Sequence, residues 1–195
     1  AQVISSELQL KNLSAKVLEV IVESAGASAA GLVIFQNGDF RLAAQVGQQM
    51  PMTLPDNPPI LEDATGVPIN IIRYVLHSGE LVNIGDVLSE RAFTDDPYIV
   101  KLQPRSILCL PVIYRDETIG ALYLENNLSI NAFTPDRLDV IYLLLAQAAI
   151  SFDNAHLFAE VTQLNQTLEQ KVEQRTADLG QANKRLNLAV KDLEV

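Results

Sequence analysis

A long proline-free stretch closes the chain and sets the strongest limit on its architecture. No proline occurs after Pro135, and Thr134, Pro135 and Asp136 together form a helix-start signal. Threonine suits the N-cap position, proline suits the first helical position, and an aspartate in the first turn complements the helix dipole. One helix is therefore predicted to run from Pro135 almost to Val195.

The second half of this helix carries apolar residues at the spacing of a coiled coil. Steps of four, three and four separate the first members, a further step of four makes a stutter at Val172, and the alternation then resumes. A plain linker helix is the alternative, but an apolar stripe of this length has to be buried, and an identical helix is the simplest partner. The sequence leaves the orientation of the two helices open, although an output domain at the same end of both chains would favour a parallel pair. We expect a homodimer whose seam contains Leu157, Val161, Leu164, Leu168, Val172, Leu179 and Leu186. The predicted domains are a globular part, residues 1–156, and a coiled-coil signalling helix, residues 157–195.

Composition limits the classes of partner. With 195 residues, 48% of them hydrophobic, the chain can bury one substantial core. The formal net charge of -10 argues against nucleic acid as a partner, because phosphate binding needs clustered Lys and Arg. The longest apolar run, residues 140–150, is too short to cross a bilayer. A single cysteine, Cys109, suits a reducing compartment. We therefore expect a cytoplasmic protein that binds no membrane.

Hydrophobic periodicity predicts alternating helices and hairpins before the long helix. The predicted helices cover residues 8–24 and 69–77, and the predicted strands cover residues 29–35, 40–46, 81–84, 106–114 and 118–125. The pair Asn37-Gly38 is the strongest hairpin signal, because both residues tolerate a positive φ. Residues 47–68, with five prolines, and residues 85–105 are expected to be irregular loops.

Several segments resemble one known family. They are Ser106-Ile-Leu-Cys-Leu-Pro-Val112, Ile119-Gly-Ala-Leu-Tyr-Leu-Glu-Asn126, Phe133-Thr-Pro-Asp-Arg-Leu138 and Ala148-Ala-Ile-Ser-Phe-Asp-Asn-Ala-His-Leu157. Together they resemble the C-terminal half of GAF domains from large bacterial sensor histidine kinases. Residues 168–179 are similar to the connector that precedes the kinase or cyclase domain in such proteins. The resemblance is weak over residues 47–68.

The resemblance implies an α+β fold, with about six antiparallel strands, helices on one face and a pocket on the other. A helix and loops over residues 69–77, 84–86 and 93–98 would roof that pocket. We expect a small-molecule site lined by Ile72, Ile84, Phe93, Tyr98 and Leu110, with Asp86, Asp96 and Arg105 as polar anchors. The sequence does not identify the ligand or any cofactor. The alternative is that Phe93 and Tyr98 fill the pocket and leave a dimerisation module without a ligand.

The sequence carries no recognisable catalytic or metal-binding set. Cys109 alternates among apolar residues in a predicted strand and is interpreted as core filler rather than a bilin attachment site. His77 has no partner at ligand spacing, and His156 lacks the sequence of a kinase phosphorylation box. The motif of the cyclic-nucleotide phosphodiesterase members is also absent. A haem or chromophore sensor remains a weaker possibility.

These observations predict a non-catalytic regulatory module of a signal-transduction kinase. In the first hypothesis, a ligand or partner changes the packing of the roof, and the long helix relays the change to a downstream kinase in cis. In the second, the module sets dimer geometry and has no signal of its own.

Overall fold

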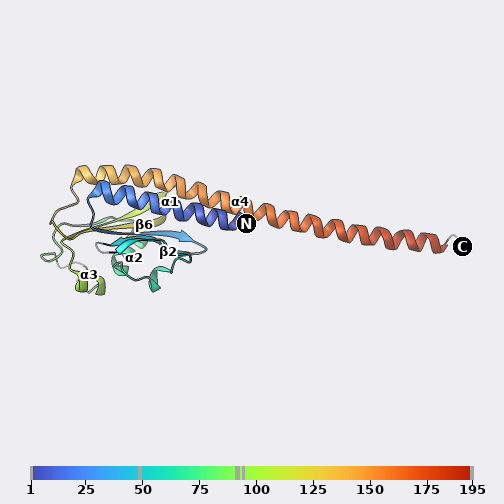
Figure 1. The fold of residues 1–195 in the computed structure, drawn as a ribbon, viewed down its shortest axis with the longest axis horizontal. Helices are drawn as coiled ribbons and strands as arrows, with labels where there is room; N and C mark the ends of the chain where they lie inside the picture. Colours follow the sequence, from blue (N-terminus) through green and yellow to red (C-terminus); the bar gives the residue numbers. More distant parts are fainter. Residues whose placement is uncertain (1, 48–49, 91–92, 94, 194–195) are drawn as a thin grey trace.

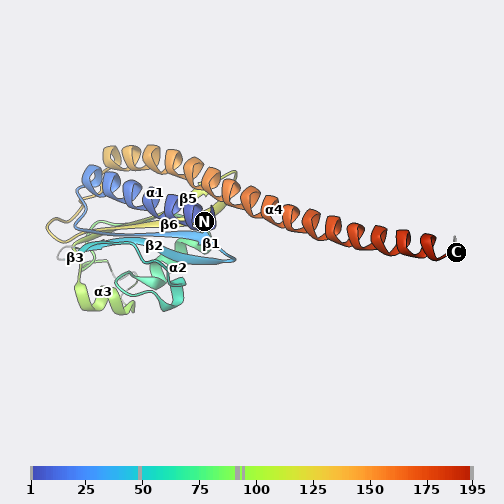
Figure 2. The same ribbon diagram turned by 45° about the vertical axis from the view of Figure 1, so that its right-hand side comes forward.

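The structure is a computed structural model and describes residues 2–47, 50–90, 93 and 95–193, including all their side chains except those of residues 2–9, 156, 159 and 184–193. A six-stranded antiparallel sheet forms the middle layer, with strand order β3-β2-β1-β6-β5-β4. Helices α1 (Gln2–Ala25) and α4 (Pro135–Leu193) cover one face, while α2 (Ile69–Ser78) and α3 (Pro97–Leu102) lie on the other (Figures 1 and 2). This is the predicted α+β fold.

Two hairpins build the centre of the sheet. The first joins β1 (Ala29–Gln36) to β2 (Asp39–Gly47), and the second joins β5 (Ser106–Tyr114) to β6 (Glu117–Asn126). Asn37 and Gly38 have φ values of 52° and 89°, as the Asn-Gly signal predicts for a tight hairpin turn. The second turn is shorter than predicted, because Glu117 pairs with Tyr114 and leaves two turn residues.

Three elements lie in segments predicted to be irregular. Strand β3 (Met50–Thr53) pairs with β2, a single helical turn covers Leu61–Asp63, and α3 follows the loop after β4 (Val82–Ile84). Each element has six residues or fewer, which is too short to show a hydrophobic period. β3 also contains Pro51, which is acceptable only because β3 is an edge strand.

The helix-side core holds α1 and α4 against the sheet. Leu18 and Ile21 of α1 and Ile141, Leu145 and Phe152 of α4 are all buried there. The side chain of Arg137 donates hydrogen bonds to the carbonyl oxygens of Ala25, at 3.1 Å, and Ala132, at 2.8 Å. The end of α1 is thus fixed to the start of α4.

A second core lies on the opposite face of the sheet, and we call it the roof layer. It consists of the side chains of α2, α3 and their loops packed on the face of the sheet opposite α1 and α4. Its buried members include Ile71, Ile72, Val75, Ile84, Ile99, Ile107, Cys109, Ala121 and Tyr123. The sheet therefore separates the long helix from the predicted ligand site.

Helix α4 has 59 residues and extends well beyond the sheet (Figure 1). The predicted seam residues Leu157, Val161, Leu164, Leu168, Val172 and Leu179 are all exposed on the single chain, and the side chain of Leu186 lies outside those described. By length and apolar composition alone, Pro135–Asn183 would also pass as a membrane span. Because α4 supplies core residues such as Ile141 and Phe152, that test is weak here, and the absence of a membrane remains a prediction.

Candidate ligand site in the roof layer

The structure gathers four of the predicted pocket residues. Ile72 of α2 and Ile84 of β4 are buried in the roof layer, and Phe93 and Tyr98 pack against it partly buried. The rings of Tyr98 and Tyr123 make an edge-to-face contact with centroids 6.0 Å apart. These four side chains therefore belong to, or pack against, the same buried cluster.

Leu110 lies on the wrong face of the sheet for the predicted pocket. It belongs to the helix-side core together with Leu108 and Val112, whereas Ile107 and Cys109 face the roof. Successive side chains of a strand point to opposite faces, and β5 is apolar on both. The prediction for Leu110 is therefore wrong, because nothing in an evenly apolar strand distinguishes its two faces.

Asp96 holds two helix starts in place. Its carboxylate accepts a hydrogen bond from the backbone N–H of Tyr98 at 2.9 Å, as the N-cap of α3. The other oxygen accepts from the backbone N–H of Asn70 at 3.0 Å, in the first turn of α2. Asp96 is 2% exposed, and Pro68 gives α2 no side-chain cap of its own. This carboxylate therefore joins the two helices of the roof.

The other two predicted anchors lie at the rim of the roof. Arg105 is exposed, and Asp86 is half-buried in the loop after β4. Hydrogen bonding to Ser89 lowers the pKa of the Asp86 carboxyl, with a smaller contribution from the charge of Arg105. Asp86 also accepts from the backbone N–H of Leu88 at 3.2 Å. Asp86 thus orders its own loop.

A hydrogen-bonded cluster around the buried Glu125 is the main feature that the sequence did not predict. Glu125, 2% exposed, accepts hydrogen bonds at 2.8 Å from the hydroxyls of both Tyr98 and Tyr123 through the same oxygen, Oε2. Its Oε1 accepts from the side-chain amide of Asn127 at 3.1 Å. These donors satisfy the buried carboxylate without a cation. The available signal was that Glu125 has the same strand parity as Ala121 and Tyr123, which face the roof.

The two tyrosines of this cluster are expected to resist ionisation in the folded protein. Burial first, and the negative charge of Glu125 second, raise the pKa of both hydroxyls above the ordinary value. Because a raised pKa favours the protonated folded form, the stabilisation is complete below the unfolded pKa of about 10 and is lost as the pH rises further. We predict that not all of the five tyrosines of the chain titrate before the protein unfolds at alkaline pH. Ultraviolet absorbance of tyrosinate measures this, and titration of all five in the folded state would contradict it.

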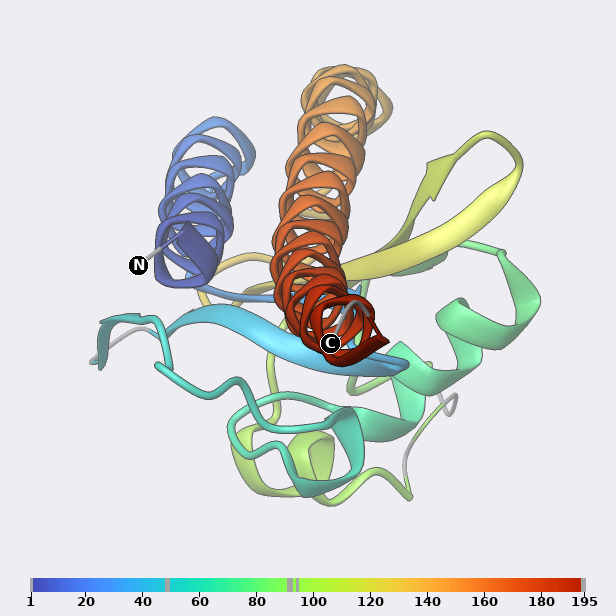
Figure 3. The same ribbon diagram turned by 90° about the vertical axis from the view of Figure 1, so that its right-hand side faces the viewer.

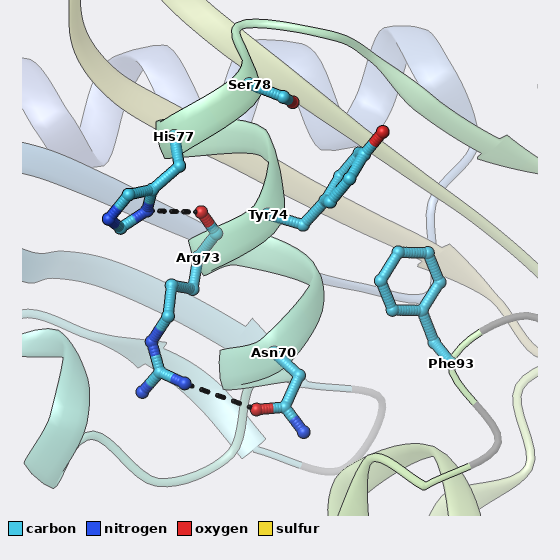
Figure 4. Close-up of a pocket in the computed structure, with 6 residues that line it drawn as sticks. All are labelled: Asn70, Arg73, Tyr74, His77, Ser78 and Phe93. Carbon is cyan, nitrogen blue, oxygen red and sulfur yellow. Dashed lines mark hydrogen bonds between the residues drawn. The ribbon is translucent and has the colours of Figure 1, made fainter.

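A shallow hollow of about 560 Å³ lies on the outer side of α2 (Figure 4). Asn70, Arg73, Tyr74, His77, Ser78 and Phe93 line it. Figure 4 shows the rings of Tyr74 and Phe93 beside each other, with centroids 5.7 Å apart. Of the predicted site residues only Phe93 borders this hollow, so it is distinct from the buried cluster around Ile72.

Cys109 and His77 are the two residues that could be considered as metal or chromophore ligands, and the structure gives the contacts of both. Cys109 is fully buried in β5, and burial raises the pKa of its thiol, which agrees with core filler. The Nδ1 of His77 forms a hydrogen bond of 2.8 Å with the carbonyl oxygen of Arg73, one turn earlier in α2. Among the residues that the structure describes, no three His, Cys, Asp or Glu side chains gather as a metal site would need.

Comparisons with known proteins agree with this architecture. The chain is 37% identical over 124 residues to the hybrid signal transduction histidine kinase G of Dictyostelium discoideum, covering 63% of the chain and 4% of that kinase. It is 29% identical over 161 residues to the peroxide stress-activated histidine kinase mak3 of Schizosaccharomyces pombe, covering 82% of the chain and 7% of that kinase. The chain thus spans a small fraction of these relatives. Both are eukaryotic, so the predicted bacterial origin remains a prediction.

The fold is also found among solved structures. The GAF domain region of a putative membrane protein from Geobacter sulfurreducens has a TM-score of 0.60 at 15% identity, covering 78% of this chain and 99% of that one. The family model of the GAF domain matches residues 9–152, which include the whole sheet, both of its covering layers and the first part of α4. The chain therefore belongs to the GAF domain family, whose members are typically regulatory and sensory modules of signalling proteins.

Proposed function

We propose that this chain is the sensory relay of a signal-transduction histidine kinase, and that it passes a change in the roof layer to a dimeric coiled coil. One observation carries the proposal: α4 is a single helix that belongs both to the domain core and to the exposed seam. Ile141, Leu145 and Phe152 are buried against the sheet, and Leu157, Val161 and Leu164 are exposed further along the same helix. A displacement of the part of α4 that packs in the core therefore also moves the exposed seam further along the same helix.

The input in this proposal is a small molecule or a partner that binds the roof. In this proposal the joined helices α2 and α3 move as one unit between two states, because Asp96 ties them to each other and the hydrogen bond from Tyr98 to Glu125 ties α3 to β6. A ligand shifts such an equilibrium only by its differential affinity, and a shift from 1:99 to 99:1 needs about 5.5 kcal/mol. The stutter at Val172 supplies a place where two seam packings differ little in energy.

A second function, a dimerisation module without a ligand, is favoured by the packing of the predicted pocket. Ile72 and Ile84 are buried within the roof layer, and the polar groups of Asp96 and Tyr98 are already hydrogen-bonded there. In this reading the module sets the spacing and geometry of the two output domains.

The two functions differ in their response to changes in the roof. Under the relay, Phe93→Ala in the intact parent kinase alters autophosphorylation, because the ring packs on α2 beside Tyr74. The matched control is Phe35→Ala, which removes an exposed ring at the hairpin end of β1. An unchanged kinase with a folded Phe93→Ala domain would favour the structural module.

Both functions require the dimer, which a charge in the seam should break. We predict that Leu164→Asp combined with Leu168→Asp weakens dimerisation at least about a hundredfold, because two carboxylates per chain would be buried against apolar partners. Native mass spectrometry over a dilution series measures the dissociation. The control, Gln163→Asp with Gln170→Asp, adds the same charge on another exposed face of the helix and should remain dimeric. A monomeric wild-type chain would overturn the proposed function.

A further inference from the structure

The coiled-coil spacing does not begin at Leu157 but continues backward along the globular domain. Counting back in alternating steps of three and four from Leu157 reaches Asn154, Ile150, Gln147, Leu143 and Val140. All five are exposed, and the apolar ones strongly so: Val140 is 47%, Leu143 73% and Ile150 44% exposed. The heptad phase therefore holds without interruption from residue 140 to residue 168.

This extended seam lies opposite the face that α4 buries in its own domain. In a heptad that starts with Val140 as position a, the buried Ile141, Leu145 and Phe152 fall at positions b and f, on the far side of the helix. Figure 3, viewed along α4, shows the side of the helix away from the sheet covered by no other element. α4 thus has two apolar faces, and among the side chains that the structure describes only one of these faces has a partner within the chain.

Over residues 10–25, whose side chains are described, the neighbouring helix α1 offers no comparable surface. Its described solvent-facing residues include Asn12, Lys16, Glu19 and Glu23. Among its described side chains, none of the large hydrophobic ones is exposed. The exposed apolar surface on this side of the domain is therefore that of α4.

The length of the seam matches what a specific dimer needs. At 1.5 Å per residue and a width of about 10 Å, the seam over residues 157–193 covers only about 540 Å² per chain. Extension back to residue 140 raises this to about 800 Å², the usual size of a specific interface for one partner. The extension is also continuous with the tail seam of the proposed function.

Two amide side chains interrupt the extended seam, and both occupy position a. Gln147 and Asn154 are one heptad apart, with Val140 and Val161 at the flanking a positions. In a parallel pair in register, position a faces position a, so each amide meets its own copy and can exchange hydrogen bonds with it. In an antiparallel pair, position a faces position d, and every d residue from 143 to 164 is apolar, so the amides would lack polar partners.

We propose that the outer face of α4 over residues 140–168 pairs with a second copy of this chain, and that Gln147 and Asn154 fix the pair as parallel and in register. The inference rests on the proposed function, because it extends the dimer seam of the tail into the globular domain. In this inference the two polar residues set the orientation and register of the pair and do not increase its stability. The β-branched residues at position a and leucines at most d positions also favour two strands.

Disulfide trapping in the full chain tests the position of the interface. Leu143→Cys and Leu164→Cys should each form a covalent dimer on mild oxidation, because a seam residue faces its own copy within the Cα distance of about 7 Å that a disulfide allows. The controls Tyr142→Cys and Gln163→Cys, each one residue away and exposed, should not. Cys109 is buried, so the wild type supplies the background.

The trapping outcomes separate this inference from the proposed function. If Leu164→Cys forms the disulfide and Leu143→Cys does not, the dimeric tail stands and the extended interface is wrong. If neither variant forms it and native mass spectrometry finds a monomer, the proposed function fails as well.

A second measurement isolates the two amides. In the Leu143→Cys background, Gln147→Val with Asn154→Val should lower the dimer dissociation constant about tenfold, because polar groups at position a reduce stability. The yield of the Leu143→Cys disulfide should nevertheless fall, because antiparallel and shifted pairs become competitive. An unchanged yield would overturn the role of the amides. Gln163→Val with Gln170→Val, both outside the seam, is the matched control and should alter neither quantity.

Discussion

Replacing Glu125 by alanine is expected to lower the free energy of unfolding by about 4 kcal/mol. The carboxylate accepts from Tyr98, Tyr123 and Asn127, and it is almost fully buried. Its removal leaves two tyrosine hydroxyls in the roof layer without their acceptor, and an unsatisfied buried polar group costs about 1–3 kcal/mol. Cavity formation adds to this loss. Denaturant unfolding at fixed protein concentration measures the change.

A glutamate on the same strand provides the control for this prediction. Glu117 is exposed at the start of β6, so Glu117→Ala should change the stability by less than about 0.5 kcal/mol. Equal effects of the two substitutions would show that the cluster around Glu125 does not stabilise the fold. Tyr98→Phe, which removes one of the hydrogen bonds, should cost about 1 kcal/mol.

Replacing Asp96 by alanine is expected to cost about 3 kcal/mol. Loss of an N-cap costs about 1 kcal/mol, and the charged hydrogen bond to Asn70 contributes about 1.5–3 kcal/mol more. For a chain of this size the melting temperature should fall by about 6–12 °C. Because Asp96 links α2 with α3, the same change should increase hydrogen exchange in the first turns of both helices.

The adjacent residue makes a close control. Asp95→Ala removes the same charge from an exposed neighbouring position and should leave the melting temperature nearly unchanged. If Asp96→Ala accelerated exchange only in α3, the carboxylate would act as an ordinary N-cap, and its link to α2 would be unsupported.

Long and strongly patterned elements of this fold could be predicted from the sequence. The periodicity of residues 8–24, the Asn37-Gly38 turn and the proline-free stretch after Pro135 each reflect local preferences that tertiary packing reinforces. Strand β3 could not be predicted, because its pairing with β2 is a tertiary contact and Pro51 argues against a strand. Helix α3 had a usable signal, since Asp96-Pro97 is an N-cap followed by proline at the first helical position.

The candidate site was only partly predictable, for reasons that concern strand faces and distant partners. Both faces of β5 are apolar, so the sequence could not place Leu110 on the helix side. Glu125 ends a strand, where an exposed charge is common, and its partner Tyr98 lies 27 residues earlier in the chain. Asp96 was predicted as a ligand anchor, but its oxygens accept from two backbone N–H groups, and only the folded roof brings that of Asn70 to the carboxylate.

The edges of the sheet limit how this protein can assemble. One edge is β3, which has four residues and a proline without an N–H, and the other is β4, which has three residues. Such edges give another chain little backbone to extend, so strand addition and aggregation through the sheet are disfavoured. The proposed association uses exposed side chains on α4 instead. Contacts of that kind can separate and re-form in a second arrangement without unfolding the domain, which a reversible signal requires.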